Sequence, residues 1–172
     1  MSSLSPTHED NLSVSWWFIG ATLFAAFMLN LIPWGQFYGV PDFLAITLLY
    51  WSVYQRQRVG IAIAFVFGLL MDVNNATILG ETAFAYTLMT YFAITLHRRI
   101  LWFSWSRHLG YIFLLLSIEY IVVMVVQLLC GSEWEGWYWI IDCAVGTLIW
   151  PIAQWLLSWP SRRADGKENQ LV

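Results

Sequence analysis

The sequence predicts an all-α membrane protein that crosses the bilayer six times. Composition, the number of apolar segments and the placement of the basic residues lead to this prediction. Of the 172 residues, 59% are hydrophobic and 11% are charged, whereas soluble domains carry about 25% charged residues. So little charge could not cover the surface of a water-soluble domain. The composition therefore excludes an ordinary soluble domain, a disordered chain and a nucleic-acid-binding protein.

Six apolar segments are separated by short polar or turn-forming breaks. A helix needs about 20 residues to cross the hydrocarbon core, so this length allows about six crossings and no separate soluble domain. The segments are 16–33, 41–54, 59–73, 79–96, 108–130 and 137–158. We expect a cytoplasmic N-terminal tail over 1–15, a six-helix transmembrane domain over 16–160 and a cytoplasmic C-terminal tail over 161–172.

The basic residues predict the orientation of the chain. All eight lie in the second loop, the fourth loop or the C-terminal tail, and the other three loops carry none. Because basic loops stay in the cytoplasm, both termini are expected inside (N-in/C-in). The loop residues predicted to form a basic inner surface are Arg56, Arg58, Arg98, Arg99 and Arg107. The break over 97–107 is expected either to anchor on the inner leaflet or to bind a cytoplasmic partner.

Small residues recur every four positions in the third segment, at Gly60, Ala64 and Gly68. They place a narrow face on one side of the helix, where another helix can approach closely. The neighbour is either a helix of the same chain or the helix of a partner, and the pattern leaves both open.

Ionisable side chains inside the crossings are the candidate functional residues, because burying them in lipid costs several kcal/mol. A helix over 59–72 spans only about 21 Å, which would leave Asp72, Asn74 and Asn75 within the outer leaflet. Asp142 is expected at a matching depth in the sixth segment. We therefore predict a polar pocket that opens outward around these four residues; a plain surface turn is the alternative.

Glu119 lies near the middle of the fifth segment, with Gln127 two turns outward on roughly the same face. No Arg or Lys lies within a crossing, so the acidic groups must be protonated, hydrogen-bonded, hydrated or paired with a basic group of another chain. Asp42 is expected at a helix start, where a carboxylate suits the helix dipole. Cys130 and Cys143 are expected to be unpaired, with a disulfide as the alternative.

Most enzyme classes lack support in the sequence. All three histidines lie in tails or at predicted interfaces, and no H-E-x-x-H metal motif or glycine-rich phosphate loop occurs. No nucleophile stands beside a histidine base at membrane depth. We therefore expect no catalytic residue, no bound metal and no cofactor.

Several motifs together resemble the bacterial rod shape-determining protein MreD family. They are Tyr50-Trp51, Arg58-Val59-Gly60, Gly68-Leu69-Leu70-Met71-Asp72, Leu79-Gly80 and Trp150-Pro151. The resemblance covers about residues 41–160. It implies a multi-pass protein of the bacterial inner (cytoplasmic) membrane and a fold similar to the S components of energy-coupling-factor transporters.

The same resemblance implies a function and partners. It implies a non-enzymatic scaffold of the cell-elongation complex, the elongasome, that regulates cell shape and peptidoglycan synthesis through helix-face contacts. MreC is the expected partner, with a RodA-type glycosyltransferase and its penicillin-binding transpeptidase, MreB and membrane lipids as further ones. The alternative is a small-molecule or lipid-binding membrane protein resembling a transporter's substrate-binding subunit.

Overall fold

The computed structural model describes residues 15–32, 40–55, 57–102, 105–131 and 139–158, with the side chains of 97–107 left out. Within these ranges the chain is entirely helical apart from turns and helix ends, which confirms the all-α prediction. Each predicted segment overlaps one helix, and α3, α4 and α5 extend beyond the segments predicted for them. The helices are α1 (Trp16–Leu31), α2 (Phe43–Tyr54), α3 (Ile61–Asn75), α4 (Glu81–Trp102), α5 (Trp105–Leu129) and α6 (Trp139–Leu157).

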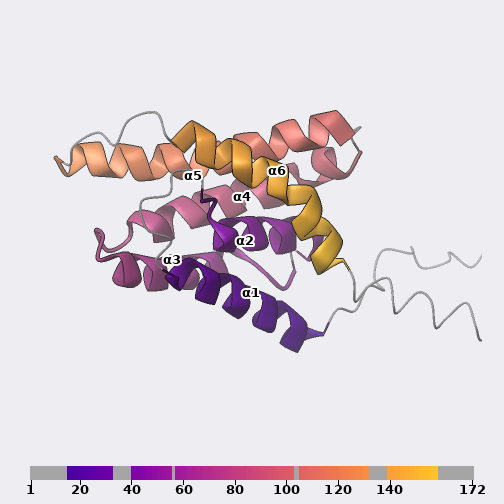
Figure 1. The fold of residues 1–172 in the computed structure, drawn as a ribbon, viewed down its shortest axis with the longest axis horizontal. Coiled ribbons are helices and arrows are strands. Elements are labelled where there is room, and N and C mark those ends of the chain that lie inside the picture. The colour runs from indigo at the N-terminus through magenta and orange to yellow at the C-terminus, as the bar shows by residue number, and fades with distance from the viewer. Residues whose placement is uncertain (1–14, 33–39, 56, 103–104, 132–138, 159–172) are drawn as a thin grey trace, which may run out of the picture.

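The helices run roughly along the long axis of the molecule, which is horizontal in Figure 1. The start of α1 and the end of α6 lie at the same end, at the right of the picture, together with the α2–α3 connection. The α3–α4 connection lies at the opposite end. This arrangement places both ends of the helical domain together, as the predicted topology requires. Which end faces the cytoplasm stays a prediction from the basic residues.

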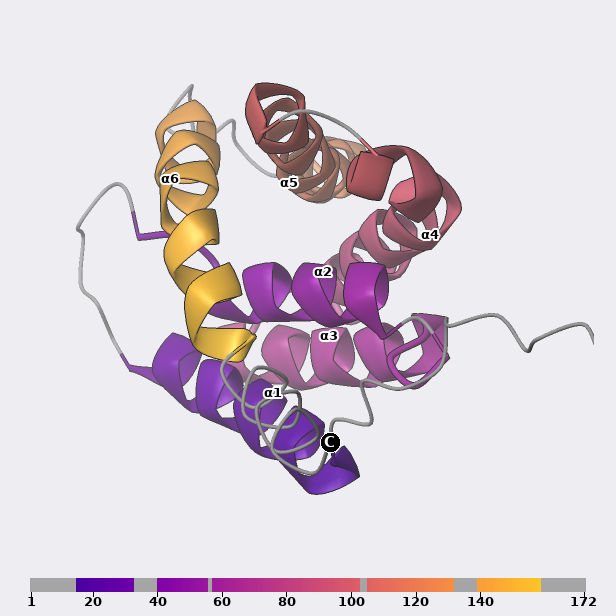
Figure 2. The ribbon, with the colours of Figure 1, turned by 90° about the vertical axis from the view of Figure 1, so that its right-hand side faces the viewer.

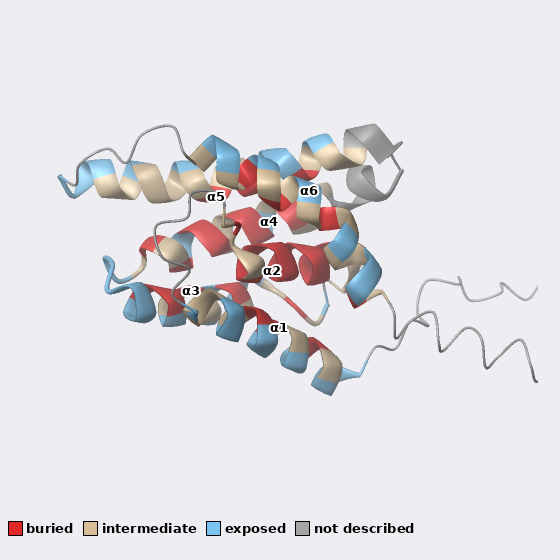
Figure 3. Cartoon of the chain, in the orientation of Figure 1, coloured by how far each residue is buried: buried red, intermediate tan, exposed pale blue. Residues whose placement is uncertain are grey.

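Helix α2 lies in the middle of the bundle (Figure 2). Its ten residues from Leu44 to Val53 are all buried, and α1, α4 and α6 pack around it. A helix that is apolar on every side is stable only inside a packed core. Figure 3 shows the consequence: buried residues concentrate on α2, whereas the outward faces of α1, α3 and α6 are exposed.

Two helical stretches, His108–Leu129 and Trp139–Leu157, are long and apolar enough to cross a membrane. Helices α1, α2 and α3 are apolar but shorter, with 16, 12 and 15 residues. At 1.5 Å per residue, α2 extends only about 18 Å. Crossing by all six helices therefore stays a prediction, and α1 to α3 need a locally thinner bilayer or association with other helices to achieve it.

The fourth connection is much shorter than the break predicted over 97–107. Helix α4 continues to Trp102 and α5 begins at Trp105, so the predicted break is wrong over most of its length. The physical reason is that 97–107 contains neither Gly nor Pro. Charge alone does not end a helix, since Arg has a high helix propensity.

Candidate functional site

Polar side chains form hydrogen bonds with the carboxylate of Asp42, at the start of α2. As the N-cap of α2, Asp42 accepts a hydrogen bond from the backbone N–H of Ala45 at 2.8 Å, which confirms the helix start predicted there. The Asn30 side chain on α1 donates to the same oxygen, Oδ1, at 2.7 Å. The Tyr86 hydroxyl on α4 donates to Oδ2. Asp42 therefore connects α1, α2 and α4.

Glu119 on α5 completes this cluster. It is buried, with 4% of its surface exposed, and its carboxyl group lies close enough to Asp42 to interact electrostatically with it. One of its oxygens, Oε2, has no hydrogen-bond partner within the described residues. We call Asn30, Asp42, Tyr86 and Glu119 the polar cluster. It joins four helices without a basic side chain among its members.

Asp72 lies at the C-terminal end of α3 and caps the next helix. Its side chain is fully buried, and its two oxygens accept hydrogen bonds from the backbone N–H groups of Gly80 at 2.8 Å and Thr82 at 2.7 Å. These N–H groups belong to the start of α4, where the helix dipole stabilises a negative charge. Gly80 has a φ of 99°, which only glycine adopts without strain. Asp72 thus fixes the α3–α4 connection.

The other residues of the predicted outward pocket lie in different surroundings. Asn74 and Asn75 are exposed at the end of α3. Asp142 is half-buried on α6, close enough to Tyr120 and Cys143 to interact electrostatically. Helices α3 and α6 are not among the pairs that pack extensively. To open onto a pocket, Asp72 would have to release α4, so the outward pocket stays a prediction.

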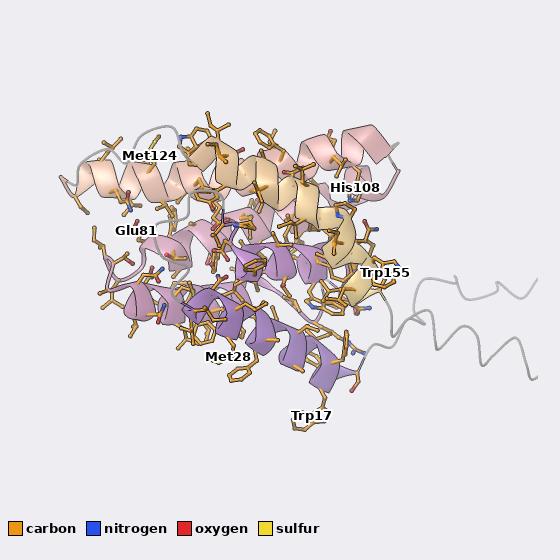
Figure 4. All side chains as sticks on the ribbon, in the orientation of Figure 1. Trp17, Met28, Glu81, His108, Met124 and Trp155 are labelled. Atoms are coloured by element: carbon orange, nitrogen blue, oxygen red, sulfur yellow. The ribbon has the colours of Figure 1, made fainter. Side chains whose placement is uncertain are left out.

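Gln127 on α5 has a partner that the sequence analysis did not assign. Its side-chain amide donates to Glu81 Oε1 at 2.7 Å, and Glu81 is buried. Figure 4 labels Glu81 at the beginning of α4. A second polar contact therefore joins α4 to α5. Loop-side acidic residues carry no pattern that distinguishes a buried one, so the sequence did not single out Glu81.

The small face of α3 packs within the chain. A Cβ atom added at Gly68 would lie 2.3 Å from Ala83 Cα on α4, and Ala64 is fully buried. Gly60, in contrast, has open space beside it. At Gly68 the close neighbour is therefore α4 of the same chain, and a partner's helix would have to displace α4 to reach this residue.

Of the five residues predicted to form the basic inner surface, the structure describes the side chain of Arg58. The Arg58 guanidinium carbon lies 5.4 Å from the ring centroid of Trp16, within the range of a cation–π interaction. Arg56 and the side chains of Arg98, Arg99 and Arg107 lie outside the described residues, so the surface stays a prediction. Both cysteines are free: Cys130 is exposed and Cys143 is buried.

An apolar groove of about 700 Å³ lies between α1, α2 and α6, and the sequence analysis did not predict it. Its walls run from Phe18 to Leu29 on α1 and from Ile149 to Leu157 on α6, over a floor formed by α2. The polar lining residues are Thr22 and Thr47, whose hydroxyls donate to backbone carbonyls of their own helices. The groove therefore offers hydrocarbon contacts rather than hydrogen bonds.

Comparison with known proteins gave one family and a curated relative. The family model described as rod shape-determining protein MreD matches residues 12–159. The rod shape-determining protein MreD of Haemophilus influenzae is 24% identical over 149 residues, which cover 83% of this chain and 90% of that protein. No solved structure matches the chain. The expected likeness to S components of energy-coupling-factor transporters therefore stays a prediction.

Proposed function

Because the chain belongs to the MreD family of rod shape-determining proteins, we propose that it is a non-enzymatic scaffold of the cell-elongation complex. It would reside in the bacterial inner membrane as a multi-pass protein with both termini inside. Through the faces of its helices it would hold MreC and, with MreC, the RodA-type glycosyltransferase, the penicillin-binding transpeptidase and MreB.

The observation that supports a scaffold most strongly is that the buried acidic side chains connect helices to one another. Asp42, Asp72 and Glu81 form hydrogen bonds that join one helix to another or to the start of the next, and Glu119 on α5 interacts electrostatically with Asp42. Interhelical hydrogen bonds and close packing are the forces that hold helices together in a bilayer. Groups engaged in this way fix the positions of the helices, and fixed helices present constant faces to a partner.

The outward face of α3 is the surface we assign to the partner. Its exposed apolar side chains extend over thirteen positions, or twelve steps of 1.5 Å, which is about 18 Å of helix. They are Ile61, Phe65, Val66, Leu70 and Val73. Among the described helices, α4 is the neighbour against which α3 packs extensively, so α3 lies at an edge of the bundle.

The length of α3 favours this face over those of the longer helices. At 15 residues α3 extends about 22 Å, less than the ~30 Å hydrocarbon core. A helix too short for the bilayer leaves a mismatch that association with another helix relieves. The longer α5 and α6 carry exposed apolar residues as well, but they match the bilayer without a partner.

Two valines test the assignment in a matched pair. Val66 on α3 is 55% exposed and Val125 on α5 is 45% exposed. The proposal predicts that Val66→Trp abolishes co-purification with MreC and makes rod-shaped cells round, while Val125→Trp leaves both unchanged. Retained co-purification and rod shape in Val66→Trp would show that α3 does not carry the contact.

The alternative function, a small-molecule or lipid-binding subunit like those of transporters, needs an open polar pocket near Asp72 and Asp142. The capping role of Asp72 does not favour it. Native mass spectrometry would support this alternative through a stoichiometric small molecule that is lost in Asp142→Ala.

A further inference from the structure

We propose that the groove between α1, α2 and α6 binds the two acyl chains of one anionic phospholipid, with the lipid headgroup near Arg58. The proposal goes beyond the scaffold function. It requires the membrane location and a bilayer surface at the Arg58 end of the helices, and it does not require a partner protein.

The lining of the groove suits hydrocarbon and nothing more polar. Apart from Thr22 and Thr47, every lining side chain is apolar. Thr22 donates to the carbonyl of Ile19 at 2.9 Å and accepts from Trp51 Nε1 at 3.0 Å, and Thr47 donates to the carbonyl of Phe43 at 2.8 Å. Among the described lining residues, a polar ligand would find only the remaining acceptor lone pairs of these two hydroxyls, whereas an acyl chain needs no hydrogen bond.

The length of the groove matches one leaflet. From Phe18 to Leu29 the lining of α1 covers eleven steps of 1.5 Å, about 16 Å. Half of the hydrocarbon core is about 15 Å. A lipid whose headgroup lies at the Phe18 end would therefore have chains that end near Leu29, close to the polar cluster in the middle of the bundle.

The cross-section of the groove distinguishes acyl chains from a helix. A volume of about 700 Å³ divided by about 16 Å gives a mean cross-section of about 44 Å². A hydrocarbon chain, whose carbons pack about 4 Å from their neighbours, occupies roughly 20 Å², so two chains fit. A helix of about 10 Å diameter occupies roughly 80 Å² and would enter only about halfway.

A positive charge lies at the headgroup end. Arg58 contacts Trp16 at the beginning of α1, the end at which Phe18 opens the groove. A basic group near the bilayer surface favours an anionic lipid by about 1 kcal/mol, which is roughly fivefold in binding. This charge makes the ligand an anionic lipid rather than a zwitterionic one.

The test counts lipids on the purified full-length protein. Delipidated protein in detergent is titrated with phosphatidylglycerol or with phosphatidylcholine and analysed by native mass spectrometry. Ala25→Trp and Ala153→Trp fill the groove from opposite walls. Ala144→Trp is the control, since Ala144 is exposed on α6 and nine positions, or half a helical rotation, from Ala153. Arg58→Gln removes the charge and leaves the groove.

The proposal predicts one tightly retained phosphatidylglycerol per wild-type chain and at least a tenfold loss of binding in both groove variants. The control variant binds as wild type does, and Arg58→Gln lowers the preference for phosphatidylglycerol over phosphatidylcholine roughly fivefold. No stoichiometric lipid on the wild type, or retained lipid in both groove variants, would overturn the proposal. Groove variants that keep the lipid but lose MreC would assign the groove to a partner's helix instead. If Val66→Trp loses MreC binding but still binds the lipid, the partner surface on α3 and the lipid groove are separate sites.

Discussion

Replacing Gly68 by alanine should separate α3 from α4. The new Cβ would lie 2.3 Å from Ala83 Cα, whereas carbon atoms in contact lie about 3.5–4.0 Å apart, so the start of α4 must move by about 1.5 Å. Asp72 accepts from Gly80 and Thr82 of that segment at 2.8 and 2.7 Å, and a shift of this size breaks both hydrogen bonds. Overpacking costs about 1–3 kcal/mol and a lost N-cap about 0.5–2 kcal/mol.

The change also gains about 1 kcal/mol of helix propensity. The net loss in free energy of unfolding is therefore roughly 0.5–4 kcal/mol, which lowers the thermal unfolding midpoint by a few degrees for a chain of this size. Thermal unfolding of the purified protein in detergent measures it. Gly20→Ala is the matched control: Gly20 lies inside α1 with open space beside it, so the variant should be slightly more stable than wild type. If Gly68→Ala were as stable as Gly20→Ala, the close α3–α4 contact would not exist.

Three further changes test the polar contacts and the orientation. Asp72→Ala should lose about 2–4 kcal/mol of stability, because two partly buried N–H groups lose their acceptors, and Asp72→Asn about half as much, since one oxygen remains; a loss below 0.5 kcal/mol for Asp72→Ala would contradict the cap. Glu119→Gln places an amide donor beside Asp42 and should be nearly as stable as wild type, whereas Glu119→Leu should lose about 1–3 kcal/mol; equal unfolding midpoints would argue against the polar cluster. In a chain whose native cysteines are replaced by serine, an impermeant maleimide added outside the inner membrane should label Leu79→Cys and not Gln57→Cys, and the opposite pattern would reverse the topology.

The helices were predictable because each is a local pattern. Each of the six apolar segments corresponds to one observed helix, although α3, α4 and α5 extend beyond the predicted bounds, and Pro41-Asp42 indicated the start of α2. The break over 97–107 was misplaced because clustered arginines were interpreted as a loop. Arginines do not end a helix, since Arg is among the residues with high helix propensity.

The partners of the polar side chains were not predictable, because they depend on which helices become neighbours. Asp42 and Glu119 are far apart in the sequence, and their contact arises where α2 and α5 meet α4. Asp72 was interpreted as lining a pocket because an acidic residue at membrane depth is a functional candidate. In the structure, both of its carboxylate oxygens accept hydrogen bonds from backbone N–H groups at the start of α4. The groove has no sequence signal, because it depends on the separation of α1 from α6 across α2.

The central claim is that this MreD-family protein recognises its partner through the outward face of α3, and photo-crosslinking in living cells tests it most directly. A photoreactive amino acid replaces Val66 on α3 or Val125 on α5, both exposed in the structure. The account predicts a covalent adduct with MreC from position 66 and none from position 125. Adducts of equal yield from both positions, or an adduct from position 125 alone, would contradict it.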